Sequence, residues 1–209
     1  MIIQIKNFTK KIKKNTILHN INLEFKSGSI YGIVGRNGSG KSILLKSICG
    51  LATISDGQII IDNKIIGKDI EIHPDIGAVL DNSGFLLNLS GFKNLKLLSS
   101  INNKATIQDI TNSMNLVGLD PEDKKPYKSY SLGMKQKLAI AQALMDSPEI
   151  LVLDEPFNGL DRHSVENIIK LLIKLKAENK LIIICSHIES DLNLLCDNIY
   201  ELEDGKIIR

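Results

Sequence analysis

The sequence predicts an α/β protein built around a parallel β-sheet, and three observations favour this fold. An apolar stretch over Ile30–Val34 leads into a glycine-rich loop and then into helical spacing, the context of a phosphate-binding unit. After Pro148 the chain alternates a buried strand, an amphipathic helix and another buried strand, as in a parallel sheet. Strand-like runs within the first 66 residues indicate an antiparallel layer beside this core.

Length, composition and charge limit the classes of protein to consider. The chain has 209 residues, 43% of them hydrophobic, which suits one domain with a sizeable core. A formal net charge of +2 favours neither nucleic acid nor an anionic membrane surface as a partner. No apolar stretch approaches the roughly 18 residues of a membrane span, and the N-terminus lacks a secretory cleavage pattern. Three cysteines without C-x-x-C spacing indicate reduced thiols and a cytoplasmic protein.

The N-terminal part of the chain is expected to supply the antiparallel layer. Two strand-like runs cover Ile2–Asn7 and Ile21–Phe25. The stretch Asp56–Ile66 is typical of a hairpin, because Asp-Gly and an apolar run precede a polar turn at Asp62 and Asn63. A solvated loop is expected to hold four lysines: Lys10, Lys11, Lys13 and Lys14.

The run GRNGSGKS, residues 35–42, fits the phosphate-binding pattern G-x-x-x-x-G-K-[ST]. Its glycines let consecutive backbone N–H groups point at an anion, and the following helix adds the positive end of its dipole. Lys41 is placed to reach the β- and γ-phosphates, and Ser42 offers a hydroxyl to Mg²⁺. An accidental glycine-rich turn is the alternative, which the strand–loop–helix context disfavours. The expected nucleotide-binding residues are Gly35, Asn37, Gly38, Ser39, Gly40, Lys41 and Ser42.

The middle of the chain has a different pattern of apolar residues from the segments before and after it. Between about residue 84 and residue 147 the spacing is mostly helical, over Asn94–Ile101, Ile107–Val117 and Leu132–Met145. We interpret this stretch as a helical subdomain inserted in the α/β core. Beyond it, Ser164–Ala177 is predicted to be an amphipathic helix, and two short strands are expected around the turn at residues 204–205.

The run ILVLDEP, residues 150–156, describes a buried strand whose carboxyl end carries two acids. Ligands of open α/β sheets bind at that end of the strands. We expect Asp154 to hold Mg²⁺ through water, and Glu155 to orient and polarise the attacking water. A strand that merely ends in polar residues is the alternative, and the phosphate loop makes it less favoured.

The run YSLGMKQKLAIAQAL, residues 130–144, predicts a helix with Ser131 as its N-cap, and such a helix start can bind an anion. It resembles a variant of the LSGGQ signature motif of ATP-binding-cassette (ABC) proteins, with Ser131 and Gly133 at the two most important positions. Downstream, Phe157–Asp161 resembles the D-loop of that family, and His187 resembles its switch histidine.

The resemblance covers nearly the whole chain, with at least five motifs in family order. It implies a P-loop NTPase fold of the ABC type over residues 1–209, with a parallel α/β core, an antiparallel β layer and a helical subdomain at about 84–147. The run SLGMKQ and the stretch before it look most like the branch of bacitracin exporters and lantibiotic-immunity transporters.

The resemblance also implies a mechanism and partners. Family members pair head to tail and sandwich each ATP between the phosphate loop of one copy and the signature motif of the other, so a homodimer is expected. Closure of the pair drives a separate membrane permease, which places the chain on the cytoplasmic face of the membrane, with a contact groove near Asp81–Leu89. One ATP would meet Lys41, Ser42, Asp154, Glu155 and His187 of one copy, and Ser131 and Gly133 of the other.

Two positions depart from the usual pattern of the family. Ile12 stands where an aromatic residue normally stacks on adenine, which predicts weaker or less base-selective binding. Asp81 stands where Gln is usual; it can approach Mg²⁺ or the attacking water, and a plain solvated loop residue is the alternative.

Two other functions remain as alternatives. The first is a regulatory ATP-binding subunit that does not hydrolyse ATP, which the departures at Ile12 and Asp81 keep open. The second is a soluble ABC protein that acts on DNA or ribosomes, which the nearly balanced charge disfavours, so no nucleic acid partner is expected.

Overall fold

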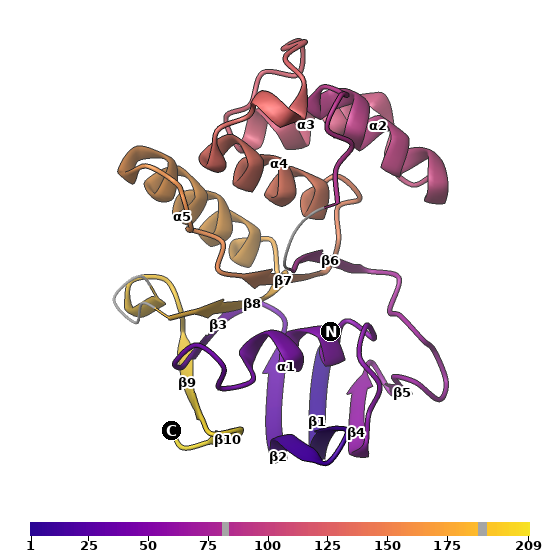
Figure 1. Ribbon diagram of the computed structural model, residues 1–209, viewed down its shortest axis with the longest axis vertical. Helices are drawn as coiled ribbons and strands as arrows, with labels where there is room; N and C mark the ends of the chain where they lie inside the picture. The colour runs from indigo at the N-terminus through magenta and orange to yellow at the C-terminus, as the bar shows by residue number, and fades with distance from the viewer. Residues whose placement is uncertain (81–83, 188–191) are drawn as a thin grey trace.

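The computed structural model describes residues 1–80, 84–187 and 192–209, and Figure 1 labels its elements. In chain order the helices and strands are β1 (Ile2–Ile12), β2 (Asn15–Lys26), β3 (Ser29–Val34), α1 (Lys41–Ile48), β4 (Asp56–Ile61), β5 (Lys64–Ile65), β6 (Ile76–Val79), α2 (Gly91–Asn102), α3 (Ile107–Leu116), the 3₁₀ turn η1 (Tyr127–Ser129), α4 (Leu132–Leu144), β7 (Ile150–Asp154), α5 (Arg162–Ala177), β8 (Leu181–Ser186), β9 (Asn198–Glu203) and β10 (Lys206–Ile207).

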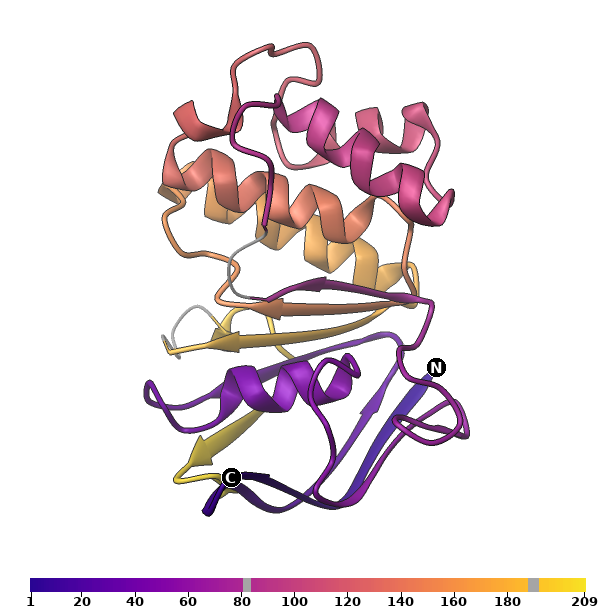
Figure 2. The same cartoon turned by 45° about the vertical axis from the view of Figure 1, so that its right-hand side comes forward.

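In the described residues, the helices pack on and between two sheets (Figure 1). The larger sheet has the order β10-β9-β3-β8-β7-β6, and its strands are parallel except for β10. The smaller sheet, β2-β1-β4-β5, is antiparallel. Figures 1 and 2 show α1 between the two sheets, and α4 and α5 over the opposite face of the larger sheet, with α2 and α3 beyond them. The predicted fold class is confirmed.

The parallel strands are buried on both faces, as strands covered by helices on both sides must be. In β8, Ile182 and Ile184 pack into the apolar cluster beneath α4 and α5. Leu181 and Ile183 alternate with them and pack into the cluster that contains α1 and the smaller sheet. All four side chains are fully buried. The continuous apolar run in the sequence therefore reflects a strand between two cores.

The first two strands are longer than predicted, and the prediction of a solvated loop at Lys10 is wrong. Register shifts between Ile5 and Phe8 and between Phe8 and Lys10 interrupt the alternation of β1, which hides the continuing strand in the sequence. Lys10 is buried, and its Nζ donates to the carbonyl of Thr53 at 2.6 Å and to its Oγ1 at 2.9 Å. The predicted hairpin of β4 and β5 is confirmed.

Three helices, α2, α3 and α4, form the layer that the sequence assigns to residues 84–147. Each begins at a side-chain cap: Ser90, Thr106 and Ser131 accept hydrogen bonds from backbone N–H groups of the first turn. The layer packs closely on β6, because a Cβ atom on Gly77 would lie only 2.0 Å from the carbonyl oxygen of Ala143 in α4.

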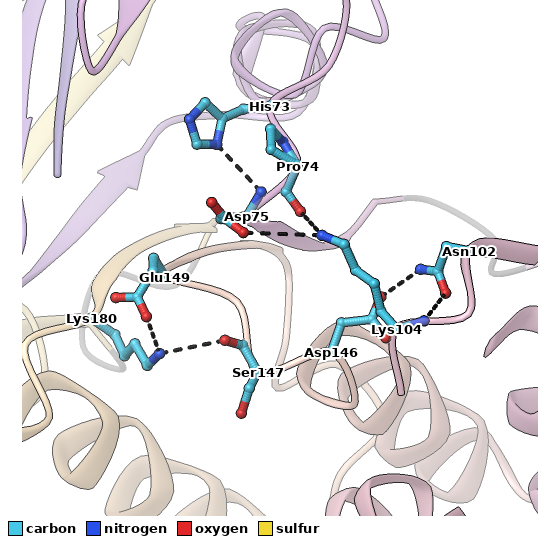
Figure 3. Close-up of polar contacts among 9 residues, drawn as sticks. All are labelled: His73, Pro74, Asp75, Asn102, Lys104, Asp146, Ser147, Glu149 and Lys180. Atoms are coloured by element: carbon cyan, nitrogen blue, oxygen red, sulfur yellow. Dashed lines mark hydrogen bonds and ion pairs between the residues drawn. The ribbon is translucent and has the colours of Figure 1, made fainter. Parts of the chain in front are cut away.

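Polar contacts join this helical layer to the core (Figure 3). After α2, Lys104 Nζ donates to the carbonyl of Pro74 at 2.7 Å, ahead of β6. Asn102 Nδ2 donates to Asp146 Oδ2 at 2.7 Å in the turn before β7. These contacts fix the end of α2 against the loops that enter the core strands.

None of the helices in the described ranges is both long and apolar enough to cross a membrane. The three cysteines are free thiols: Cys49 and Cys185 are buried and Cys196 is half-buried. Burial raises the pKa of both Cys49 and Cys196 to about 12. Burial also raises the pKa of Cys185 well above its usual range, and the nearby Asp154 adds to the shift.

We predict that all three thiols react slowly in the folded protein. A raised thiol pKa keeps the reactive thiolate scarce between pH 7 and pH 9, where an exposed cysteine already ionises. With Ellman's reagent at pH 8, the native protein should react at least about tenfold more slowly than the protein in guanidinium. A thiol that reacts at the same rate in both conditions would contradict the burial described here.

Candidate nucleotide-binding site

A cavity of about 420 Å³ lies at the carboxyl ends of β3 and β7, beside the N-terminus of α1. It brings together the two predicted halves of the site, the glycine-rich loop and the acidic strand end. Its lining residues are Ile17, Asn37, Gly38, Gly40, Lys41, Ser42, Ile43, Val79, Gln136, Asp154, Glu155 and Asn158.

The loop between β3 and α1 requires glycine at two positions facing this cavity. Gly38 has φ +84° and Gly40, the N-cap of α1, has φ +109°, both in the region that side chains disfavour. A Cβ atom on Gly40 would also lie 2.7 Å from Cδ2 of Leu18. The loop thus places the N-terminus of α1, with its unpaired N–H groups and positive dipole end, at the cavity.

Lys41 supplies the positive charge of the cavity. Its side chain is 6% exposed, and its Nζ donates to the carbonyls of Gly35 at 2.7 Å and Arg36 at 3.2 Å. These bonds hold the ammonium under the loop, where it can attract a phosphate. A buried cation satisfied by neutral carbonyls is well suited to bind an anion.

Gly35 and Ser39 lie on the other side of the loop, against β9. A Cβ atom on Gly35 would lie 2.3 Å from the carbonyl oxygen of Leu202, so this close contact requires glycine. Ser39 Oγ is buried and has no hydrogen-bond partner among the described residues. Both residues line a hollow of about 280 Å³ behind the loop instead of the main cavity. Of the seven loop residues predicted to bind nucleotide, these two therefore do not line the main cavity, and their contact with nucleotide stays a prediction.

Glu155 follows β7 in a strained conformation. Its φ of +48° lies in the left-handed region, which is uncommon for a residue with a long side chain. Its N–H donates to the carbonyl of Cys185 at 2.9 Å, and its Oε1 lies 2.9 Å from Nδ1 of His187. The carboxylate is thereby held beside an imidazole at the cavity, an arrangement that can orient a water molecule and accept its proton.

Ser42 and Asp154 give the cavity oxygen ligands that fit Mg²⁺. In the described part of the chain, no group of three or more His, Cys, Asp or Glu side chains could hold a metal ion without other ligands. A hydroxyl and one carboxylate are the limited protein contribution expected where phosphate oxygens complete the coordination. The residues therefore fit a metal ion that is bound together with a triphosphate.

The predicted signature residues do not line this cavity. Ser131 is exposed at the start of α4, where its Oγ accepts a hydrogen bond from the N–H of Met134 at 3.2 Å, which confirms the predicted N-cap. Gly133 packs against the loop after β7, since its Cβ would lie 2.9 Å from the carbonyl of Gly159. The start of this helix is thus open to a partner outside the chain's own cavity.

Ile12 and Asp81 complete the list of predicted site residues. Ile12 lies opposite Asn15 at the end of β1, is 43% exposed and does not line the cavity, whereas Ile17 on β2 does. Asp81 lies outside the residues that the structure describes.

Sequence reasoning missed five cavity residues, namely Ile17, Ile43, Val79, Gln136 and Asn158. Gln136 belongs to the helix that carries the signature motif, and Asn158 belongs to the D-loop run. Both motifs are recognisable in the sequence, but no local pattern indicates that the side chains of Gln136 and Asn158 face the cavity. Ile17 is one of many strand isoleucines, and only the fold distinguishes it.

Comparisons with known proteins agree with this site. The sequence profile described as "ABC transporter" matches residues 18–158. The chain is 41% identical over 206 residues to the uncharacterized ABC transporter ATP-binding protein YybJ of Bacillus subtilis (strain 168), covering 99% of this chain and 94% of the relative. It is 37% identical to the lantibiotic transport ATP-binding protein SrtF of Streptococcus pyogenes (99% and 89% covered). It is 36% identical to the bacitracin transport ATP-binding protein BcrA of Enterococcus faecalis (99% and 68% covered).

Among solved structures, the chain resembles the dimeric post-hydrolysis state of the ATP-binding cassette MJ0796 bound to ADP and Pi. The TM-score is 0.88 at 26% identity, and the match covers 99% of this chain and 97% of that chain. The likeness therefore extends over the whole fold described above.

We predict that Lys41→Ala lowers nucleotide affinity. Loss of a buried charged donor to phosphate should weaken ATP or ADP binding by about 2–3 kcal/mol, or roughly 30- to 150-fold, in isothermal titration calorimetry. Lys46→Ala removes the same charge near the other end of α1 and should leave the dissociation constant within about twofold. Equal affinities for Lys41→Ala and the wild type would exclude Lys41 from the site.

Proposed function

The chain belongs to the ABC transporter family, as an ATP-binding subunit that hydrolyses ATP to drive transport, and we propose that the cavity at the ends of β3 and β7 is where it does so. One observation carries this proposal: the phosphate-binding loop, Lys41, the acidic strand end and the Glu155–His187 contact converge on one cavity in a chain of this family.

Each side chain has a role that its place in the cavity supports. The loop N–H groups, the start of α1 and Lys41 Nζ bind the phosphates. Glu155 orients the attacking water and accepts its proton. His187 does not line the cavity itself, but it contacts the Glu155 carboxylate and holds it in place, and its imidazole is proposed to meet the terminal phosphate. Ser42 and Asp154 would hold Mg²⁺, which neutralises charge on the phosphates when it is bound.

A second copy of the chain is proposed to close over the nucleotide with its Ser131 and Gly133. The exposed start of α4, with Leu132 67% exposed next to Ser131, supports this role because the cavity of the same chain does not use it. A capped helix start offers N–H groups to a γ-phosphate across a dimer interface. The related MJ0796 cassette is described as dimeric, which is consistent with a homodimer.

The proposed membrane partner is a separate permease at the cytoplasmic face of the membrane. Its contact site is proposed near Asp81–Leu89, where the described residues Leu86 and Leu87 are 51% and 58% exposed. The relatives named for lantibiotic and bacitracin transport support an antimicrobial peptide or a similar drug as the cargo. Export is proposed as the direction. Asp81 is proposed to take the place of the usual Gln at the attacking water.

A regulatory subunit without hydrolysis is not favoured, because Glu155 and Lys41 line the same cavity and His187 contacts the Glu155 carboxylate at 2.9 Å. A soluble protein acting on DNA or ribosomes is not favoured either, since the relatives reported above are named as transport proteins.

We predict that the purified chain hydrolyses ATP with a specific activity that rises with protein concentration, because two copies complete each site. Glu155→Gln should lower the rate by about 100-fold or more, since it removes the base but keeps the shape of the side chain. Glu166→Gln, on the surface of α5, serves as the matched control and should leave the rate unchanged. A Glu155→Gln variant with wild-type activity would refute the assigned base.

Ile12 does not line the cavity itself, but we also predict that Ile12→Tyr strengthens ATP binding about five- to tenfold, because the longer aromatic side chain reaches further and adds stacking on the base. The ratio of ATP to GTP affinity should change with it. Ile2→Tyr is the matched control, since Ile2 lies on the same strand and is 42% exposed, close to the 43% of Ile12. If both substitutions leave nucleotide affinity unchanged in titration calorimetry, Ile12 does not lie at the base.

A further inference from the structure

Gln136 makes a contact that no motif assigns to it. The side chain lies in the second turn of α4, is half-buried, and lines the nucleotide cavity. Its Nε2 donates to the backbone carbonyl of Glu155 at 3.2 Å. The amide therefore crosses from the helical layer to the residue that is proposed to activate water.

Glu155 needs such support because its backbone is strained at φ +48°. Three groups hold the residue besides Gln136. Its N–H is bonded to Cys185 of β8, its carbonyl also accepts from the N–H of Asn158 at 3.2 Å, and its carboxylate contacts His187. Without Gln136, only the N–H of Asn158 in the turn after β7 would hold the carbonyl, and the carboxylate would be positioned less exactly.

The same helix touches the loop after β7 at a second point. A Cβ atom on Gly159 would lie 2.4 Å from Cγ of Leu132, so the start of α4 is packed directly on this loop. Figure 1 shows α4 lying across the sheet above β7 and β6. A displacement of the start of α4 would therefore be transmitted to Glu155 both through this packing and through the Gln136 amide.

We propose that Gln136 is a positioning residue for ATP hydrolysis, which holds the Glu155 backbone and connects it to the helix start that meets the second nucleotide. This inference rests on the proposed function, since it assigns water activation to Glu155 and contact with the second nucleotide to the start of α4. Gln136 then makes hydrolysis at one site respond to the position of the helix that closes the other site.

Gln136→Met tests this role, because methionine has nearly the same length and lacks the amide donor. The loss of one hydrogen bond that aligns Glu155 should lower kcat about tenfold. The dissociation constant for ADP in titration calorimetry and the midpoint of thermal unfolding should stay unchanged, since binding and packing do not need this bond. Gln142→Met is the matched control, the same substitution on the same helix at another half-buried position outside the cavity.

The inference is overturned if Gln136→Met has the same kcat as Gln142→Met. It is also overturned if a lower kcat comes with an equal loss of ADP affinity or a clear fall in the unfolding midpoint, which would indicate binding or packing. Glu155→Gln is measured in parallel to test the proposed function itself. If Glu155→Gln still hydrolyses ATP at the wild-type rate, the role assigned to Glu155 is wrong. If Glu155→Gln is inactive while Gln136→Met is fully active, only the role of Gln136 is wrong.

Discussion

Burial of β3, β8 and β7 on both faces is the constraint on which the rest of the structure depends. Their side chains alternate between two apolar clusters, one beneath α4 and α5 and one around α1. Parallel strands in such a position must all end at the same edge of the sheet. Because β8 pairs with both β3 and β7, the glycine-rich loop and the acidic pair Asp154 and Glu155 at the end of β7 meet at that edge.

The chemistry of the site depends on a backbone that the core holds in an unfavourable conformation. Glu155 would not keep φ +48° in a free peptide, and strained residues persist only where their surroundings hold them. Here the support comes from β8, from the turn after β7, from His187 and from Gln136. The strained backbone and the contacts that hold it together place the Glu155 carboxylate at the cavity. The order of residues after β7 would not place it there by itself.

In the proposed function, the helical layer takes part in two sites. Through Gln136 it contributes to the cavity of its own chain, whereas Ser131 at its exposed start does not line that cavity. The layer is attached by apolar packing on β6 and by the contacts of Lys104 and Asn102 at the far end of α2. If two copies pair as proposed, this arrangement couples their pairing to hydrolysis within a single small fold.

The sequence by itself determined the fold class, the motifs and most elements, because these depend on local patterns. The loop GRNGSGKS, the strand before Asp154 and the capped start of α4 each carry their signal within about a dozen residues. Only the tertiary structure decided the rest. Lys10 is buried because bulges change the register of β1, and Ile17, not Ile12, reaches the cavity because β2 passes beside the loop. Contacts between segments distant in sequence depend on register and packing, for which a local pattern carries no signal.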